Sequence, residues 1–257
     1  FSLMNLGKTP KLQKNDTVIK WNEFFALGKK FKGDEPKVKK CDNDVAVILF
    51  SGGTTGKTKG IMLSNLNFNA LALQTAAMSH YDIHAMKMLA AMPVFHGFGL
   101  GVCIHTMMVA GGLSILVPRF NVKAYANLIK TEKPNFIAGV PTLFEAITRN
   151  PYLDGVSLDF LRGVFSGGDS LSVELKKKFD KFLDEHGSPV HVREGYGTTE
   201  CVTASCLTPY CEEREASIGL PYPDTYYKIC AVGTCEEVPC GEEGEICLCG
   251  PSVMVGY

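Results

Sequence analysis

The chain has 257 residues, 46% of them hydrophobic, which is enough to bury a large core in one big domain or in one and a half smaller ones. Its 26 basic and 27 acidic side chains leave a formal net charge of −1, so no global field favours nucleic acid or a membrane surface as a partner. Ten cysteines in a chain of this size do not indicate a disulfide scaffold, and we expect a reducing, cytoplasmic location.

One stretch is long enough to raise the question of a membrane helix. No Asp, Glu, Lys or Arg occurs between Pro93 and Pro118, a length that could cross a bilayer. Glycines and two histidines interrupt the stretch, which favours a buried helix, a glycine break and a buried strand over a membrane span. The cysteines near the end of the chain lack the paired Cys-x-x-Cys spacing of zinc sites, so we expect them to be small strand residues.

Short apolar runs alternate with amphipathic stretches along the chain. The runs predict strands over 45–50, 88–92, 113–117, 136–139, 163–166 and 190–192, and the stretches predict helices over 64–78, 97–110, 122–133, 142–149 and 172–185. This order predicts an α/β fold with a mostly parallel sheet and helices on both faces. The continuous apolar run Val45–Phe50 is typical of a strand covered on both faces.

The pattern changes after Glu200. Strands are predicted over 226–232 and 245–249, with Gly, Pro and Glu turns between them and no helical period. We therefore expect a connecting segment over 1–44, an α/β nucleotide- and acid-binding subdomain over 45–205, and part of a small β subdomain over 206–257. The sequence indicates no oligomeric state.

Polar, glycine-rich loops follow five of the predicted strands. They begin at Ser51, Pro93, Gly139, Gly167 and Gly195. Open α/β sheets bind ligands beyond the carboxyl ends of their strands, so five loops on one rim of one sheet predict a single site.

The first loop, Ser51–Lys57, is the most specific of the five. Its glycines allow backbone N–H groups to approach anionic oxygens, Thr54 and Thr55 add hydroxyl donors, and the nearby Lys59 adds charge. The loop predicts a polyphosphate site, but it departs from a Walker loop, which runs directly into a helix. Here Gly60 and three apolar residues precede the helix predicted at Ser64, so we expect the loop to double back as a mobile flap.

These loops resemble, in order, the motifs of the AMP-forming acyl-CoA synthetase, luciferase and peptide-synthetase adenylation superfamily of adenylate-forming enzymes. The segments that carry the resemblance are FSGGTTGKTKG (50–60), PVFHGFG (93–99), FSGGDSL (165–171), EGYGTTE (194–200) and GEEGEICLCGPSVMVGY (241–257). Two positions depart from the usual pattern. Thr58 stands where the family usually has proline, and Asp169 stands where it more often has a small residue or Glu.

The resemblance implies ATP, Mg²⁺ and coenzyme A as cofactors or cosubstrates and a small carboxylic acid as substrate. It implies that Tyr196 stacks on adenine, that Thr199 donates to the α-phosphate and that Glu200 binds Mg²⁺. The catalytic residues implied are Thr54, Lys59, His96, Thr199 and Glu200. The nucleotide-binding residues implied are Ser51, Gly52, Gly53, Thr54, Thr55, Gly56, Lys57, Gly167, Gly168, Asp169, Glu194, Gly195, Tyr196, Gly197, Thr198 and Thr199.

Other functions fit the sequence less well. A serine acyl hydrolase needs Gly-x-Ser-x-Gly, and Ser166 lacks the first glycine. Amino-acid-activating members usually carry Phe-Asp where Phe95-His96 stands, so we favour a fatty or aryl acid as the substrate. The resemblance also implies a ribose-binding Thr-Gly-Asp motif and a catalytic-lysine domain beyond Tyr257. We therefore expect an internal fragment that binds nucleotide without turnover on its own.

Overall fold

The computed structural model describes residues 19–30, 38–52, 58–211 and 214–257, and it divides into two units, Phe1–Lys40 and Cys41–Tyr257. In the first unit the helix α1 (Trp21–Gly28) carries exposed aromatic side chains. The ring of Trp21 lies 5.9 Å from that of Phe24 and 6.4 Å from that of Phe25. This helix was not predicted from the sequence; it is short and has no buried side chain.

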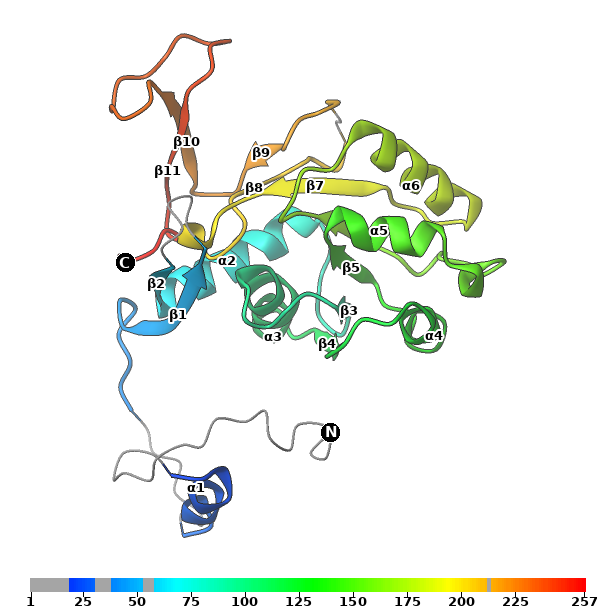
Figure 1. Ribbon diagram of the computed structural model, residues 1–257, viewed down its shortest axis with the longest axis horizontal. Coiled ribbons are helices and arrows are strands. Elements are labelled where there is room, and N and C mark those ends of the chain that lie inside the picture. Colours follow the sequence, from blue (N-terminus) through cyan, green and yellow to red (C-terminus); the bar gives the residue numbers. More distant parts are fainter. Residues whose placement is uncertain (1–18, 31–37, 53–57, 212–213) are drawn as a thin grey trace. The chain divides into compact units, whose positions relative to one another are not determined.

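A seven-stranded sheet, in the order β4-β3-β5-β6-β7-β8-β9, forms the centre of the second unit (Figure 1). Its parallel strands are β3 (Lys87–Ala90), β4 (Leu113–Leu116), β5 (Phe136–Gly139), β6 (Gly163–Ser166) and β7 (Val192–Tyr196). The short strands β8 (Cys206–Leu207) and β9 (Leu220–Pro221) continue the sheet in antiparallel pairing. The predicted α/β fold with a mostly parallel sheet is confirmed.

Helices cover both faces of this sheet. One face packs against α4 (Val122–Glu132), α5 (Pro141–Thr148) and α6 (Val173–Glu185), and the other against α2 (Asn65–Ser79), η2 (Phe98–His105) and α3 (Thr106–Val109). Side chains of successive strand residues point to opposite faces of a sheet. On β5, accordingly, Ile137 belongs to the first core cluster, whereas Phe136 and Ala138 belong to the second.

Local signals explain where the helices begin and end. Ser172 Oγ accepts a hydrogen bond from Leu175 N–H at 3.2 Å and so caps α6, as predicted. Ser64 caps α2 in the same way through the N–H of Asn67. At the end of α4, Lys133 adopts a left-handed conformation with φ 47°, immediately before Pro134.

The first apolar run departs from the prediction. Strand β1 (Val45–Ser51) pairs with β2 (Lys59–Ser64) in an antiparallel two-stranded sheet and is not part of the central one. The expectation that this strand is covered on both faces is wrong, because Ile48 is 51% and Phe50 is 70% exposed. The pairing of β1 with β2 does confirm that the chain doubles back. The predicted mobility of the loop concerns residues 53–57, which lie outside the described residues.

The boundaries in the last third also differ. Gly195 and Tyr196, which we predicted in a loop, are the last residues of β7, and β8 and β9 were not predicted at all. The predicted strand 245–249 corresponds to β11 (Glu245–Cys249), which pairs with β10 (Tyr226–Cys230) in a hairpin (Figure 1). Two short 3₁₀ turns, η3 (Pro151–Leu153) and η4 (Thr199–Cys201), complete the second unit.

The described part of the chain contains no helix long and apolar enough to cross a membrane. The uncharged stretch after Pro93 instead forms η2, α3 and β4.

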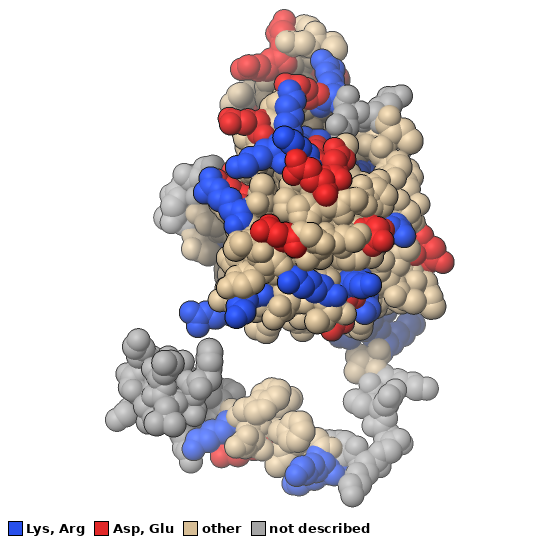
Figure 2. All heavy atoms as spheres, turned by 90° about the vertical axis from the view of Figure 1, so that its right-hand side faces the viewer, with Lys and Arg blue, Asp and Glu red and all other residues tan. Residues whose placement is uncertain are grey.

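On the face shown in Figure 2, basic and acidic side chains of the second unit are interspersed, in keeping with the near-zero net charge.

Candidate active site

The loops that follow β6 and β7 meet the helix η2 around one cavity of about 40 Å³. It is lined mainly by aromatic side chains and glycine backbone, among them Phe98, Phe165, Gly167, Gly195, Tyr196 and Tyr222. The cavity as it stands has room for only a few atoms, so any larger ligand requires lining side chains to move. Two of the predicted loops, those at Gly167 and Gly195, therefore share one cavity at the carboxyl ends of the parallel strands, and the loop at Pro93 leads into the helix η2 that lines it.

Glycine is required where two of these loops touch. A Cβ atom at Gly97 would overlap the carbonyl oxygen of Val202, and one at Gly197 would overlap that of Thr203. The backbone around His96 therefore packs directly on the backbone that follows η4. Val202 itself has φ 66°, a strained conformation for a β-branched residue.

His96 is exposed, so it is not a histidine enclosed in the core. Its Nδ1 accepts a hydrogen bond from Phe98 N–H at 3.1 Å, which leaves the proton of the neutral ring on Nε2. Partial desolvation of the exposed ring by neighbouring atoms lowers the pKa of His96. The neutral ring therefore prevails at pH 7 and presents Nε2–H as a donor.

The loop after β6 is held by its neighbours. Gly167 N–H donates to Gly139 O at 3.2 Å, Gly168 has φ 78°, and Ser170 N–H donates to the carboxylate of Asp169 at 2.8 Å. Leu171 N–H donates to Glu194 Oε1 at 3.3 Å. Glu194, predicted as a nucleotide-binding residue, thus fastens this loop to the end of β7.

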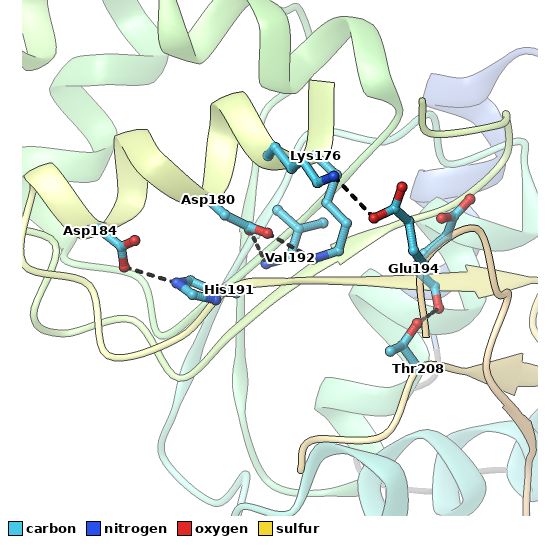
Figure 3. A network of polar contacts seen from close by, with 9 residues as sticks. Lys176, Asp180, Asp184, His191, Val192, Glu194 and Thr208 are labelled. Carbon is cyan, nitrogen blue, oxygen red and sulfur yellow. Dashed lines mark hydrogen bonds and ion pairs between the residues drawn. The ribbon is translucent and has the colours of Figure 1, made fainter. Parts of the chain in front are cut away.

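A polar network joins α6 to β7 beside Glu194 (Figure 3). Lys176 Nζ lies 2.7 Å from Asp180, whose other carboxylate oxygen accepts Val192 N–H at 2.8 Å. Burial raises the pKa of Glu194, while the Leu171 hydrogen bond and the charge of Lys176 lower it. Lys176 and Asp180 were not singled out from the sequence, although a Lys–Asp pair four residues apart on a helix was a visible signal.

Tyr196 ends β7 and lines the cavity. Its carbonyl oxygen accepts hydrogen bonds from Ser205 N–H at 2.9 Å and Ser205 Oγ at 3.2 Å, which hold the backbone on which the ring stands. Burial raises the pKa of the Tyr196 phenol, so the ring is neutral at pH 7. A neutral ring between Gly195 and Gly197 can stack on a planar base.

The turn η4 presents Glu200 near the end of the phosphate loop. Thr198 precedes this turn, Thr199 O accepts Val202 N–H at 3.1 Å, and both β1 and β2 lie against η4. The described residues contain no group of three or more His, Cys, Asp and Glu side chains that could hold a metal ion. Glu200 nevertheless fits Mg²⁺, because this ion is commonly bound by one or two carboxylates together with substrate phosphates and water.

The remaining predicted site residues belong to the phosphate loop. Ser51 ends β1, Gly52 follows it, and Lys59 begins β2. Five other residues lie outside the described residues, namely Gly53, Thr54, Thr55, Gly56 and Lys57. The hairpin thus brings the two ends of this loop together beside η4, although β1 is not a strand of the central sheet.

A parallel sheet with glycine-rich loops, a tyrosine and a carboxylate at one rim is typical of nucleotide-binding proteins of the α/β class. The comparison with protein families narrows the class, because the model of a family described as AMP-binding enzyme matches residues 4–257. The chain therefore belongs to that family.

Curated relatives agree with this assignment. The chain is 35% identical over 250 residues to a long-chain-fatty-acid–CoA ligase of Bacillus subtilis, in an alignment that covers 94% of this chain and 43% of that ligase. It is 33% identical over 216 residues to probable 4-coumarate–CoA ligase 3 of Dictyostelium discoideum, covering 83% of this chain and 38% of the relative. The chain thus spans about two fifths of the length of these relatives.

Solved structures show the same fold. ATP-bound MatB from Rhodopseudomonas palustris has a TM-score of 0.77 at 26% identity, over 87% of this chain and 43% of that one. A long-chain-fatty-acid–CoA ligase from Archaeoglobus fulgidus has a TM-score of 0.76 at 27% identity, over 83% and 44% of the two chains.

Proposed function

We propose that this chain forms the nucleotide- and acid-binding part of an AMP-forming acid–CoA ligase. The observation that supports the proposal most directly is the convergence of the loops after β6 and β7 and the helix η2 on one cavity, with Phe98, Gly167 and Tyr196 among its lining residues. The proposal includes a cytoplasmic location, which the ten free cysteines support. It also includes the β10–β11 hairpin as the start of a smaller β subdomain.

In the proposed reaction, an oxygen of the substrate carboxylate attacks the α-phosphorus of ATP, and pyrophosphate leaves. The thiol of coenzyme A then attacks the carbonyl carbon of the acyl-adenylate, and AMP leaves with the electrons of the broken C–O bond. Neither step needs a covalent bond to a protein side chain. The chain therefore acts by positioning the two reactants and by stabilising charge.

Each residue has a specific role in this proposal. The ring of Tyr196 stacks on adenine beside the loop Gly167–Asp169, which Glu194 fastens in place. Thr199 donates to the α-phosphate, Lys59 neutralises charge on the phosphates, and the hydroxyl group of Thr54 donates a hydrogen bond to them. Glu200 would hold Mg²⁺, which shields the phosphate oxygens from the incoming carboxylate.

His96 orients the acid. Its Nε2–H is a donor in the neutral ring, because Nδ1 is occupied by Phe98 N–H. A neutral imidazole can donate to a carboxylate but offers no fixed negative charge to an ammonium group. This favours a fatty or aryl acid over an amino acid, and the curated relatives named above include ligases of both fatty and aryl acids.

A pyrophosphate-exchange assay with a panel of fatty, aryl and amino acids tests the proposal. Because the chain spans about two fifths of its relatives' length, we propose that it binds ATP but does not turn over alone. Calorimetry with ATP and Mg²⁺ on this chain should therefore detect binding, whereas exchange should be slow or absent. An absence of ATP binding, or a preference for amino acids in the exchange assay, would contradict the proposal.

A further inference from the structure

The last residues of the chain join two parts of the proposed site. Met62 N–H of β2 donates to Gly256 O at 2.9 Å, and Val255 N–H donates back to Met62 O at 2.9 Å. Met254 N–H donates to the carbonyl oxygen of Glu200 at 2.7 Å. Residues 254–256 therefore lie beside β2 and hold the turn η4 against it.

Tyr257 follows this segment and contacts two oppositely charged residues. Its Oη donates a hydrogen bond to Glu200 Oε1 at 3.2 Å. The Nζ of Lys59 lies 4.7 Å from the centroid of the same ring, within the range of a cation–π interaction. One phenol thus contacts the carboxylate through its hydroxyl group and the ammonium through its ring.

Lys59 and Glu200 do not pair with each other in the described chain. An ammonium and a carboxylate on flexible side chains attract one another, and an exposed pair of this kind gains up to about 1 kcal/mol. Such a pair would have to break before Lys59 could bind phosphate and Glu200 could bind a metal ion. A phenol that contacts both groups keeps them from pairing.

We propose that Tyr257 is a positioning residue that keeps Lys59 and Glu200 apart and holds the Glu200 carboxylate ready for magnesium–nucleotide. The inference rests on the proposed function of the site and extends it to a residue outside the motif that contains Glu200. Tyr257 acts through Glu200 and Lys59, and no contact with the substrate is required of it.

The test is calorimetric titration of the chain with ATP, with and without Mg²⁺. Tyr257→Phe keeps the ring beneath Lys59 and removes the hydroxyl group, so the gain in affinity from Mg²⁺ should fall about three- to tenfold, as expected for one hydrogen bond. Affinity for ATP without Mg²⁺ should not change. Tyr257→Leu removes both contacts and should reduce the gain further, because Lys59 and Glu200 can then pair.

Tyr152→Phe is the matched control. Tyr152 also lies beneath a lysine, with Lys123 Nζ 5.5 Å from its ring centroid, but it belongs to η3 and not to the site. This variant should bind magnesium–ATP as the unmodified chain does. If Tyr257→Phe behaves like Tyr152→Phe, the inference is wrong.

A double-mutant cycle separates this inference from the proposed function. In a Glu200→Gln background, Tyr257→Phe should cause no further loss of the magnesium effect. If Glu200→Gln removes the effect of Mg²⁺ while the Tyr257 variants retain it, only the role of Tyr257 is refuted. If Glu200→Gln also retains the effect, the metal assignment of the proposed function fails, and the inference fails with it.

The contact itself can be measured without any nucleotide. The changes in thermal unfolding midpoint caused by Tyr257→Phe and Glu200→Ala should not be additive, because both variants remove the same hydrogen bond. Additive changes would show that the two side chains are not coupled in solution, and would overturn the inference whatever the chain binds.

Discussion

The carboxylate of Glu194 accepts the N–H of Leu171, 23 residues earlier in the chain, at 3.3 Å. This bond ties the loop after β6 to the last residues of β7, the two segments between which we propose that adenine binds. Glu194→Ala should weaken ATP binding by roughly tenfold, since the loop loses a hydrogen bond to an ionised group. Glu194→Gln retains an acceptor and should have a smaller effect. Equal losses for the two variants, measured by calorimetry, would argue against this anchoring role.

The stability contribution of Glu194 should depend on pH. Burial raises its pKa above the ordinary value, so the folded chain binds this proton more tightly than the unfolded chain does. Stability from this group is therefore fully present below the unfolded pKa and is lost as the pH rises through the folded pKa. Glu194→Gln, which carries no charge, should gain stability relative to the unmodified chain at pH 7, and this gain should shrink towards pH 4. Denaturant unfolding of both proteins at several pH values measures the difference.

Lys59 should contribute to ATP binding through charge. Replacing Lys57 and Lys59 together by Ala should lower the affinity for ATP by about tenfold or more at low salt, since each can make a charge-assisted contact with phosphate. The difference should decrease as salt is added, because screening weakens exposed charges. Lys123→Ala on α4 is a suitable control for a general loss of positive charge. Affinity that does not change at low salt would remove these lysines from the phosphate site.

His96 should affect the acid and not the nucleotide. His96→Ala removes the Nε2–H donor and should leave calorimetric ATP affinity within about twofold of the original. Binding of a carboxylic acid in the presence of ATP should weaken by roughly tenfold, as expected when a carboxylate loses a donor. A variant that loses ATP affinity instead would place His96 at the nucleotide.

Gly97 should be intolerant of any side chain. In Gly97→Ala the new Cβ would overlap the carbonyl oxygen of Val202, so one of the two backbones must shift. We expect a loss of about 1–3 kcal/mol in the free energy of unfolding. Gly28→Ala is the control, because a Cβ at that position meets no atom within 4 Å. Similar unfolding free energies for the two variants would contradict the close approach.

Elements defined by local patterns were predicted well. Strands β5, β6 and β11 have the predicted residues, and α6 begins after Ser172, because apolar runs and capping side chains are visible in neighbouring residues. Which strand pairs with which could not be predicted in the same way. The apolar run of β1 resembles that of a buried central strand, but β1 pairs with β2 because the chain reverses its direction between Ser51 and Lys59. Hydrophobic periodicity does not reveal such a reversal. Strands of two residues, such as β8 and β9, are too short to show a pattern.

The site could be predicted only as a set of motifs. Glycines, hydroxyl groups and charges that lie together in the sequence identify the loops, and two of these loops, at Gly167 and Gly195, share one cavity. The hydrogen bonds that hold the loops join Glu194 to Leu171 and Glu200 to Tyr257, over 23 and 57 positions. No local pattern encodes such pairs, because they depend on how the strands stack.

The β1–β2 hairpin is anchored unevenly. Ile61 and Leu63 are fully buried towards its base, whereas Phe50, next to the phosphate loop, is 70% exposed. A bend confined to the exposed end would leave the seven-stranded sheet and its hydrogen bonds intact, since β1 and β2 pair in a separate sheet.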